Sequence, residues 1–302
     1  MRCKAGILRN VLVLLALLSS ATLYSKSSGN VCSYFAFTVS GGYSSIMTHD
    51  KLVTPFGFLG GAVGLGYEMY VSDKHFWMSV LGEAQCMTSV LSVKSAEAER
   101  LIAEDVSRLS TMDYKVGKWE DYPHCLFLSL PVMLGYRNRE FYFGIGPKLS
   151  FFSFGRTMSK LKYSISSDES SDIYTDYSAS NAVNIKNNPY NVAACFEIGG
   201  VVYDPSNRIG SYGREIGSYN PNVAVKLAFY AEYWLMNMNM SSGQNKLVTI
   251  QQNEAHTLDI VPLFVSNAMT NATANPLYAG LKLTVLYNPS PWKKYRHRAR
   301  VY

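Results

Sequence analysis

Seven ionisable residues stand inside segments that are otherwise apolar or small, where charge is costly. They are Glu68, Glu83, Lys148, Glu197, Lys226, Glu232 and Lys282. Four acids and three bases at such depth can neutralise one another in a packed interior, or they can form a path for protons or ions. The run "PLYAGLKLTVLY" (276–287) poses the question most clearly, because Lys282 lies in its middle. The residue types alone leave both chemistries open.

Nucleophilic catalysis would need a Ser or Cys with a His in hydrogen-bond reach. The five histidines are His49, His75, His124, His256 and His297, and most fall in expected loops, turns or the chain end. None has the His-x-Ser spacing that would place both side chains on one face of a strand, and His124 and Cys125 would point to opposite faces. We therefore expect no catalytic residues and no enzyme. A lipid-modifying enzyme is a less favoured alternative.

Metal and cofactor chemistry is not indicated either. Past the N-terminal segment the cysteines are Cys32, Cys86, Cys125 and Cys195, without C-x-x-C spacing. The glycine-rich run "GGAVGLG" (60–66) is not followed by a helical pattern, so it does not predict a dinucleotide site. We expect no metal and no cofactor. A disulfide between Cys86 and Cys125 stays open, although the alternation described next puts them on opposite faces.

Eight segments alternate apolar with polar or small residues at a period of two, which predicts strands. They cover residues 33–47, 57–71, 76–88, 125–136, 141–153, 190–203, 222–237 and 277–287. In the last of them Leu281 and Leu283 fall on one face and Lys282 on the other. The apolar face of these segments is nearly uninterrupted, whereas the other face holds Gly, Ala, Ser, Tyr and isolated ions. A soluble barrel would place varied charge outward, so this pattern favours a transmembrane barrel with lipid outside and a polar lumen.

The predicted fold class is therefore all-β, a closed antiparallel up-and-down transmembrane barrel. Several segments have the nine to eleven residues that a tilted strand needs to cross a bilayer. Eight strands are expected, or ten if "KLVTI" (246–250) and "TLDIVPLF" (257–264) also cross. Short joins at 72–75 and 137–140 and long polar loops at 89–124, 154–189 and 238–276 match the short-turn, long-loop asymmetry of outer-membrane barrels. The long join at 204–221 does not fit it.

The two chain ends carry separate expectations. Arg2, Lys4 and Arg9 precede the apolar stretch 11–18 and a small-residue end, so residues 1–21 are predicted to be a signal peptide. Residues 22–288 are the predicted barrel and 289–302 a basic tail. The tail holds Lys293, Lys294, Arg296, Arg298 and Arg300, and it is either a solvated end or a contact for anionic lipid or an acidic partner.

Net charge argues against nucleic acid as a partner. The formal charge of +6 falls to about +3 once the three bases of the signal peptide are removed, which is too little to attract a polyanion. The partners that we expect are outer-membrane lipid and a secretion-machinery or periplasmic protein. The residues name no small-molecule ligand.

Two local features add expectations. "SAEAERLIAEDVSRLS" (95–110) has helical spacing and predicts a short amphipathic helix on the barrel mouth or a partner-binding helix. Pro131 and Pro147 fall almost opposite each other across the join at 137–140. Because proline cannot donate to a β-ladder, we predict a bulge there.

The middle of the chain resembles a known family. "LSLPVMLGYRNREFYFGIGPKLSFF" (128–152) is similar to the fourth and fifth strands of PorT-like outer-membrane β-barrel proteins of Bacteroidota, and "YAGLKLTVLY" (278–287) to their closing strand. The resemblance covers the strands, about half the chain, and not the long loops. It implies an eight-stranded outer-membrane barrel, assistance to type IX secretion in some relatives, and no catalytic residues.

The sequence thus predicts an exported, multi-pass outer-membrane barrel that acts as a binding or accessory protein, with support of type IX secretion as its most specific form. The first alternative is a structural or adhesive barrel of the OmpA or OmpX type that presents surface loops such as 167–180. An open porin is the last, because eight strands leave no aqueous channel.

Overall fold

The computed structural model describes residues 31–48, 53–71, 75–95, 98–99, 102, 113–138, 140–166, 174–185, 190–203, 223–238, 248–250, 258–262 and 274–288. The predicted signal peptide and basic tail lie outside these residues, as does the join at 204–221. Among the residues described, no helix is long and apolar enough to span a membrane.

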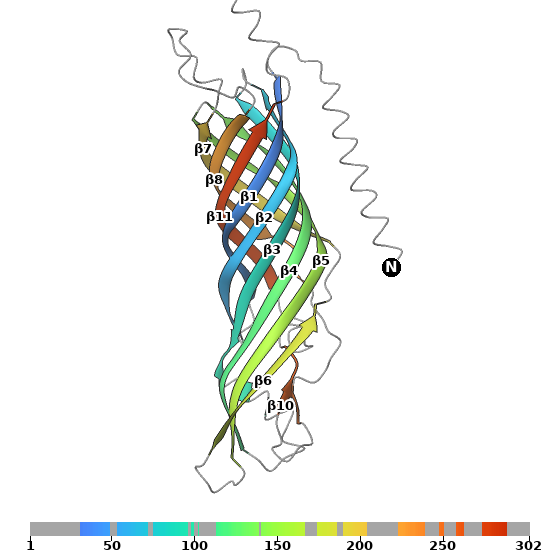
Figure 1. The fold of residues 1–302 in the computed structure, drawn as a ribbon, viewed down its shortest axis with the longest axis vertical. Coiled ribbons are helices and arrows are strands. Elements are labelled where there is room, and N and C mark those ends of the chain that lie inside the picture. The colour runs from blue at the N-terminus through green and yellow to red at the C-terminus, as the bar shows by residue number, and fades with distance from the viewer. Residues whose placement is uncertain are drawn as a thin grey trace, which may run out of the picture.

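Eight strands of the described chain close an antiparallel ring (Figure 1). They are β1 (Val31–Thr48), β2 (Val53–Val71), β3 (Phe76–Val93), β4 (Asp113–Arg137), β5 (Phe141–Ser166), β7 (Tyr190–Tyr203), β8 (Val223–Trp234) and β11 (Ala274–Tyr287). Chain neighbours pair in sequence, and β11 closes the ring by pairing with β1. The predicted fold class is confirmed. Seven of the eight predicted segments lie within these strands, and the eighth, 222–237, overlaps β8, which ends earlier, at Trp234.

The alternative of ten crossing strands is wrong. Within the expected segments the structure places only β9 (Val248–Ile250) and β10 (Leu258–Ile260), three residues each. These two strands pair with each other and not with the barrel wall. Strands this short cannot cross a bilayer, which requires about nine residues or more.

The outer wall of the ring is an apolar belt. On β5 and β4 the outward side chains include Ile145, Phe154 and Leu126, and each is at least 39% exposed. Beyond the belt the next outward residues on these faces are Arg156 and His124, which pair across the two strands, and Met158 and Tyr122 form the pair after them. A belt of this kind around a closed barrel is suited to hydrocarbon, because no strand edge is left unpaired in lipid. The predicted outer-membrane localisation agrees with this wall.

Past the belt, toward the lower end of the molecule in Figure 1, strands β4 and β5 continue as a long hairpin, and β6 (Thr175–Asn184) pairs with β5. We call residues 113–124, 156–166 and 174–185, with β9 and β10, the extension. Its inward residues form a hydrophobic cluster separate from the barrel interior, the extension core. It comprises Val53, Val93, Ala98, Ile102, Val116, Trp119, Leu161, Tyr163, Ile165, Val248, Leu258 and Ile260.

The predictions of loops at 89–124 and 154–189 are therefore wrong for much of their length. In 160–165 the inward residues Leu161, Tyr163 and Ile165 are apolar, while the outward Lys160 and Lys162 are charged. This is the reverse of the lipid-facing pattern. The segment alternates as a strand of a soluble protein does, so the apolar lipid-facing pattern that predicted the other strands is absent from it.

The helix predicted at 95–110 falls mostly outside the described residues. Its first turn is present, since the Ala98 amide donates to the Lys94 carbonyl at 2.9 Å. Ala98 and Ile102 are buried in the extension core and not spread over the barrel mouth. Periodicity predicted the turn but not the surface that it covers.

The predicted bulge at the two prolines is wrong. Pro131 pairs with Lys148 and Leu134 with Ile145 in one register, so the ladder lapses between them without inserting a residue. The bulges of this hairpin lie elsewhere, at Val116/Lys118 and next to Leu126/Phe127. A local gap in the strand pairing thus accommodates the backbone N–H groups that the prolines lack. The bulges, which increase the local twist of a strand pair, lie instead near the point where the strands leave the belt and farther along the extension.

Adjacent glycines on β1 provide a test of barrel packing. A Cβ on Gly42 would lie 2.3 Å from the Ala279 carbonyl oxygen of the facing strand, whereas a Cβ on Gly41 would meet nothing within 4 Å. We expect Gly42→Ala to lower the unfolding free energy by about 1–3 kcal/mol through overpacking. Gly41→Ala should change it by less than about 0.5 kcal/mol. Urea unfolding in detergent micelles, followed by tryptophan fluorescence, measures both, and equal midpoints would contradict the close approach of β1 and β11.

Candidate functional site

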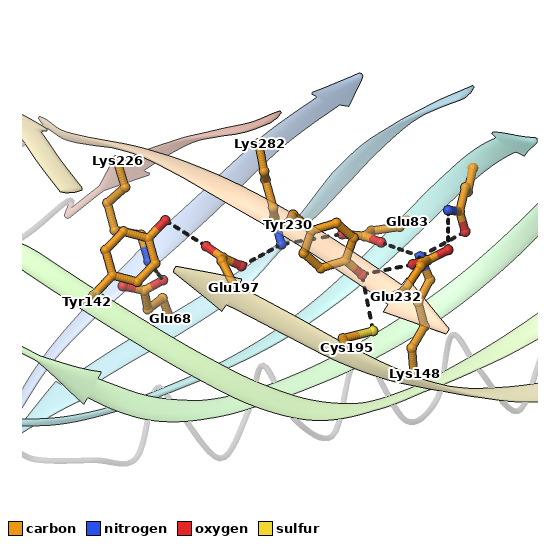
Figure 2. A network of polar contacts seen from close by, with 11 residues as sticks. Glu68, Glu83, Tyr142, Lys148, Cys195, Glu197, Lys226, Tyr230, Glu232 and Lys282 are labelled. Carbon is orange, nitrogen blue, oxygen red and sulfur yellow. Dashed lines mark hydrogen bonds and ion pairs between the residues drawn. The ribbon is translucent and has the colours of Figure 1, made fainter. Parts of the chain in front are cut away.

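The structure places all seven predicted ionisable residues inside the barrel, between 0% and 6% exposed. They project from β2, β3, β5, β7, β8 and β11, and Figure 2 shows their side chains converging along the lumen. We call these seven, with Gln85, Arg137, Tyr142 and Tyr230, the luminal network. Alternation alone gives the direction of each side chain, and closure of the ring brings residues as far apart in the chain as Glu83 and Lys282 into contact.

At the end of the barrel that carries the tight β4–β5 turn, Glu68 binds two cations. Lys226 Nζ lies 2.6 Å from Glu68 Oε2, and Arg137 Nη1 lies 3.7 Å from Oε1. The Lys226 ammonium also lies over the ring of Tyr142, 4.2 Å from the centroid. Arg137 was assigned to a turn in the sequence and missed as a network member. Its charge makes four bases for four acids among the described luminal residues.

Deeper in the lumen, Lys148 is the centre of a second group. Its Nζ lies 2.7 Å from Glu232 Oε2 and 3.0 Å from Glu83 Oε2, and it donates to Gln85 Oε1 at 2.8 Å. The Gln85 amide in turn donates to Glu232 Oε1. The Tyr230 hydroxyl lies 2.9 Å from Glu232 Oε2 and donates to it. Every charge in this group therefore has a partner.

Lys282 joins the two groups. Its Nζ lies 3.1 Å from Glu197 Oε2 and 3.8 Å from Glu83 Oε1 (Figure 2). The Tyr142 hydroxyl donates to Glu197 Oε1 at 2.7 Å, which links back to the Lys226 group. The contacts form one chain along the lumen. They explain why Lys282 lies in the middle of an apolar strand, since its side chain bridges two acids inside the barrel wall.

Large aromatic side chains fill the space around the ions. Trp77, Phe127 and Trp234 are at most 1% exposed and belong to the interior cluster. Glycine makes room for them: a Cβ on Gly144 would lie 2.4 Å from Cζ2 of Trp77. A lumen this closely packed matches the small barrels whose interior holds only side chains. The arrangement can seal and stiffen the barrel.

The described residues bring no nucleophile and base together. His75 Nδ1 contacts the Arg137 carbonyl oxygen at 3.2 Å, His124 faces outward, and the other three histidines lie outside the described chain. Cys86 is exposed, Cys125 is buried, and both are free, so the open disulfide between them is not formed. No group of three metal-binding side chains occurs among the described residues.

Comparisons with known proteins add little beyond the fold. No family model and no curated protein matches the sequence. Ail of Yersinia pestis, solved with a heparin analogue, is 9% identical over 83% of this chain and 98% of its own, with a TM-score of 0.26. Neisserial surface protein A is 8% identical over 84% of this chain and 96% of its own, with a TM-score of 0.25. OprG of Pseudomonas aeruginosa is 10% identical over 82% of this chain and 95% of its own, with a TM-score of 0.23. Values this low carry no argument about function, and the barrel architecture rests on the strand pairing itself.

The network predicts a strong contrast between a buried and an exposed lysine. Lys148→Met should lower the unfolding free energy by about 3–5 kcal/mol, because it leaves Glu83 and Glu232 with an uncompensated buried charge. Lys118→Met removes a lysine that pairs with Glu120 at the surface and should cost less than about 1 kcal/mol. Urea midpoints in detergent compare the two.

A second variant separates charge from packing. Adding Glu232→Gln to Lys148→Met removes one of the stranded carboxylates and should recover part of the loss. A Lys148→Met protein as stable as the wild type would contradict a network held together by its charges.

Proposed function

We propose that the protein is a non-enzymatic outer-membrane barrel that binds an extracellular ligand through its extension. The observation that carries the proposal is the extension core, a second hydrophobic cluster built on strands that run past the lipid belt. A membrane anchor needs no such structure. A binding protein gains from it, because a surface held rigid before binding loses less conformational entropy on association.

Several contacts hold the extension together. Trp119 Nε1 donates to Ser159 Oγ at 2.8 Å, and Ser159 Oγ donates to the buried carboxylate of Asp121. The β9–β10 pair is tied to the hairpin, since the Leu258 amide donates to the Tyr163 hydroxyl at 2.8 Å and the Asn181 amide to the Ile260 carbonyl at 2.6 Å. These bonds fix segments that lie far apart in the sequence into one unit.

The side of the membrane follows from the connections. The β4–β5 turn spans only residues 138–140, and the extension lies at the other end of the same hairpin. Outer-membrane barrels keep short turns in the periplasm and long connections outside. On this rule the extension is extracellular, and an adhesive or ligand-binding role at the cell surface is the form of the proposal that it favours.

Support of type IX secretion is a second form, motivated by the PorT-like resemblance of residues 128–152 and by the basic tail. It would use the periplasmic end of the barrel. A pull-down from native outer membranes, comparing the full chain with one that ends at Tyr287, tests it. Secretion support predicts that a secretion component is recovered with the full chain and lost with the shorter one. Equal recovery would remove the tail from the interaction, and recovery of none would contradict this form.

The binding role predicts that the extension can be damaged without loss of the barrel. Trp119 is fully buried in the extension core. Trp119→Ala should destabilise that core by about 3–5 kcal/mol. We expect limited proteolysis in detergent to cut the extension of the variant and leave a protected barrel fragment. Cells that display the variant should attach less to immobilised matrix proteins or polysaccharides than cells that display the wild type.

Trp119→Phe is the matched control, because it keeps most of the apolar contact and should retain both properties. A Trp119→Ala protein with the wild-type cleavage pattern would show that the extension is not a packed unit. Cleavage of the extension with undiminished attachment would contradict its role in binding.

A further inference from the structure

The outward face of the extension is strongly basic. Five exposed cations lie on it, here called the cationic face: Lys115 and Lys118 of β4, and Arg156, Lys160 and Lys162 of β5. The described acids beside them are Glu120 on β4, Asp176 on β6 and Glu99, whose carboxylate accepts a hydrogen bond from the Val116 amide at 3.2 Å. The opposite side of the same strands packs into the extension core, so these five side chains are held on one surface by the burial of their neighbours.

The strand register concentrates the charge. Lys118 pairs directly with Lys162, and Glu120 with Lys160. Like charges opposite each other weaken a strand pair, so the Lys118–Lys162 position is unfavourable without an anion. The bulge between Val116 and Lys118 adds Gly117 to β4 and thereby keeps Lys115 on the same face as Lys118.

One acid is already engaged within this face. Lys118 Nζ lies 2.8 Å from Glu120 Oε1, and the Tyr122 hydroxyl donates to Glu120 Oε2 at 2.7 Å. Partial burial raises the pKa of Glu120, but the hydrogen bonds from Lys118 and Tyr122 outweigh it and hold that pKa below its usual value. Glu120 is therefore ionised at neutral pH and offsets one of the five cations.

Strand β6 contributes neutral hydrogen-bonding groups. Ser178 lies opposite Lys162, Ser180 opposite Lys160, and Asn184 opposite Arg156, all of them exposed. Hydroxyl and amide groups beside ammonium groups suit a ligand that carries both negative charge and hydroxyls, such as a phosphorylated sugar.

The position of the face identifies the source of such a ligand. It begins at Arg156, two residues past the lipid-facing Phe154 and on the same side of β5. The face therefore overlooks the lipids around the barrel and not the barrel mouth. Lys160 and Lys162 are six and eight residues beyond Phe154, so at the usual rise and tilt of barrel strands they stand roughly 15–20 Å above the belt. A phospholipid headgroup layer is only about 5–7 Å deep.

We propose that the cationic face binds the phosphate groups of a phosphorylated glycolipid in the outer leaflet, with Arg156 at headgroup level and the lysines at its sugars. The proposal rests on the extracellular placement of the extension given above. It names the ligand class that this surface of the extension takes. Bound lipid would steady the extension against the membrane.

The test uses the full chain in nanodiscs of phosphatidylcholine with a minor share of a fluorescent diphosphorylated glycolipid. The measurement is the glycolipid enriched around the protein relative to empty discs. Because a basic residue near a charged surface contributes about 1 kcal/mol, the variant K118Q/K160Q/K162Q should lose affinity by about tenfold or more. The charge-conserving variant K118R/K160R/K162R should retain it. Glu120→Gln should increase enrichment by a few fold, and added salt should reduce enrichment for the wild type.

Four outcomes would overturn the inference. The first is that the wild type and K118Q/K160Q/K162Q enrich the glycolipid equally, and the second is that the wild type enriches the dephosphorylated glycolipid as much as the phosphorylated one. The third is that K118R/K160R/K162R binds as weakly as K118Q/K160Q/K162Q. The fourth is that the protein binds soluble dextran sulfate but enriches no glycolipid. The last result would assign the face to an external polyanion. Loss of attachment by Trp119→Ala alongside any of these results would leave the proposed function in place and remove only the glycolipid.

Discussion

The structure depends on the mutual neutralisation of charges inside a narrow barrel. An eight-stranded ring has room for side chains and little else, so any ion within it loses its water. A lone Lys148 or Glu232 in that position would be strongly destabilising, but together with Glu83 and Gln85 each finds a partner. The pairing also couples the strands, because the acid and base of each pair come from different parts of the wall. The pairs join strands that are not neighbours in the ring, such as β5 with β3 and with β8, so they brace the barrel across its lumen in addition to the backbone ladder.

The neutral lumen leaves the rest of the protein to act at its surfaces. With aromatic rings and ion pairs filling the interior, transport through the barrel has no support from the described residues. The belt suits lipid, and the described strands that run past it form the extension. There the polarity of the two strand faces is the reverse of that in the barrel. Apolar side chains such as Leu161 point inward to the extension core, and charged ones such as Lys160 point outward. The change from Phe154 to Arg156 on one strand face marks the boundary between the two environments.

The same strands thus face lipid along the belt and water along the extension, and their two bulges lie at positions where the outward face changes. One accompanies the passage from the belt to the extension beside Leu126, and the other, at Gly117, resets the alternation of β4 so that its lysines share a face. A hairpin of this length is stable outside the membrane because β6 extends its sheet beside β5 and the β9–β10 pair packs on its inner side. The surface that results is basic and backed by its own hydrophobic core, and the proposed function is therefore placed at this surface rather than inside the barrel.

Local alternation in the sequence determined the eight crossing strands and the inward direction of all seven luminal ions, because a strand places successive side chains on opposite faces whatever its neighbours are. Pairing partners are a different matter. That Lys282 meets Glu197 and Glu83, and that Arg137 leaves its expected turn to join Glu68, depends on how the ring closes and on residues distant in the chain. The sequence also did not predict the extension. Its strands have apolar inward and charged outward faces, the reverse of the barrel strands, and its core assembles from segments that were expected to be loops. Tertiary structure decided these features because each depends on contacts between segments that have no local signal for one another.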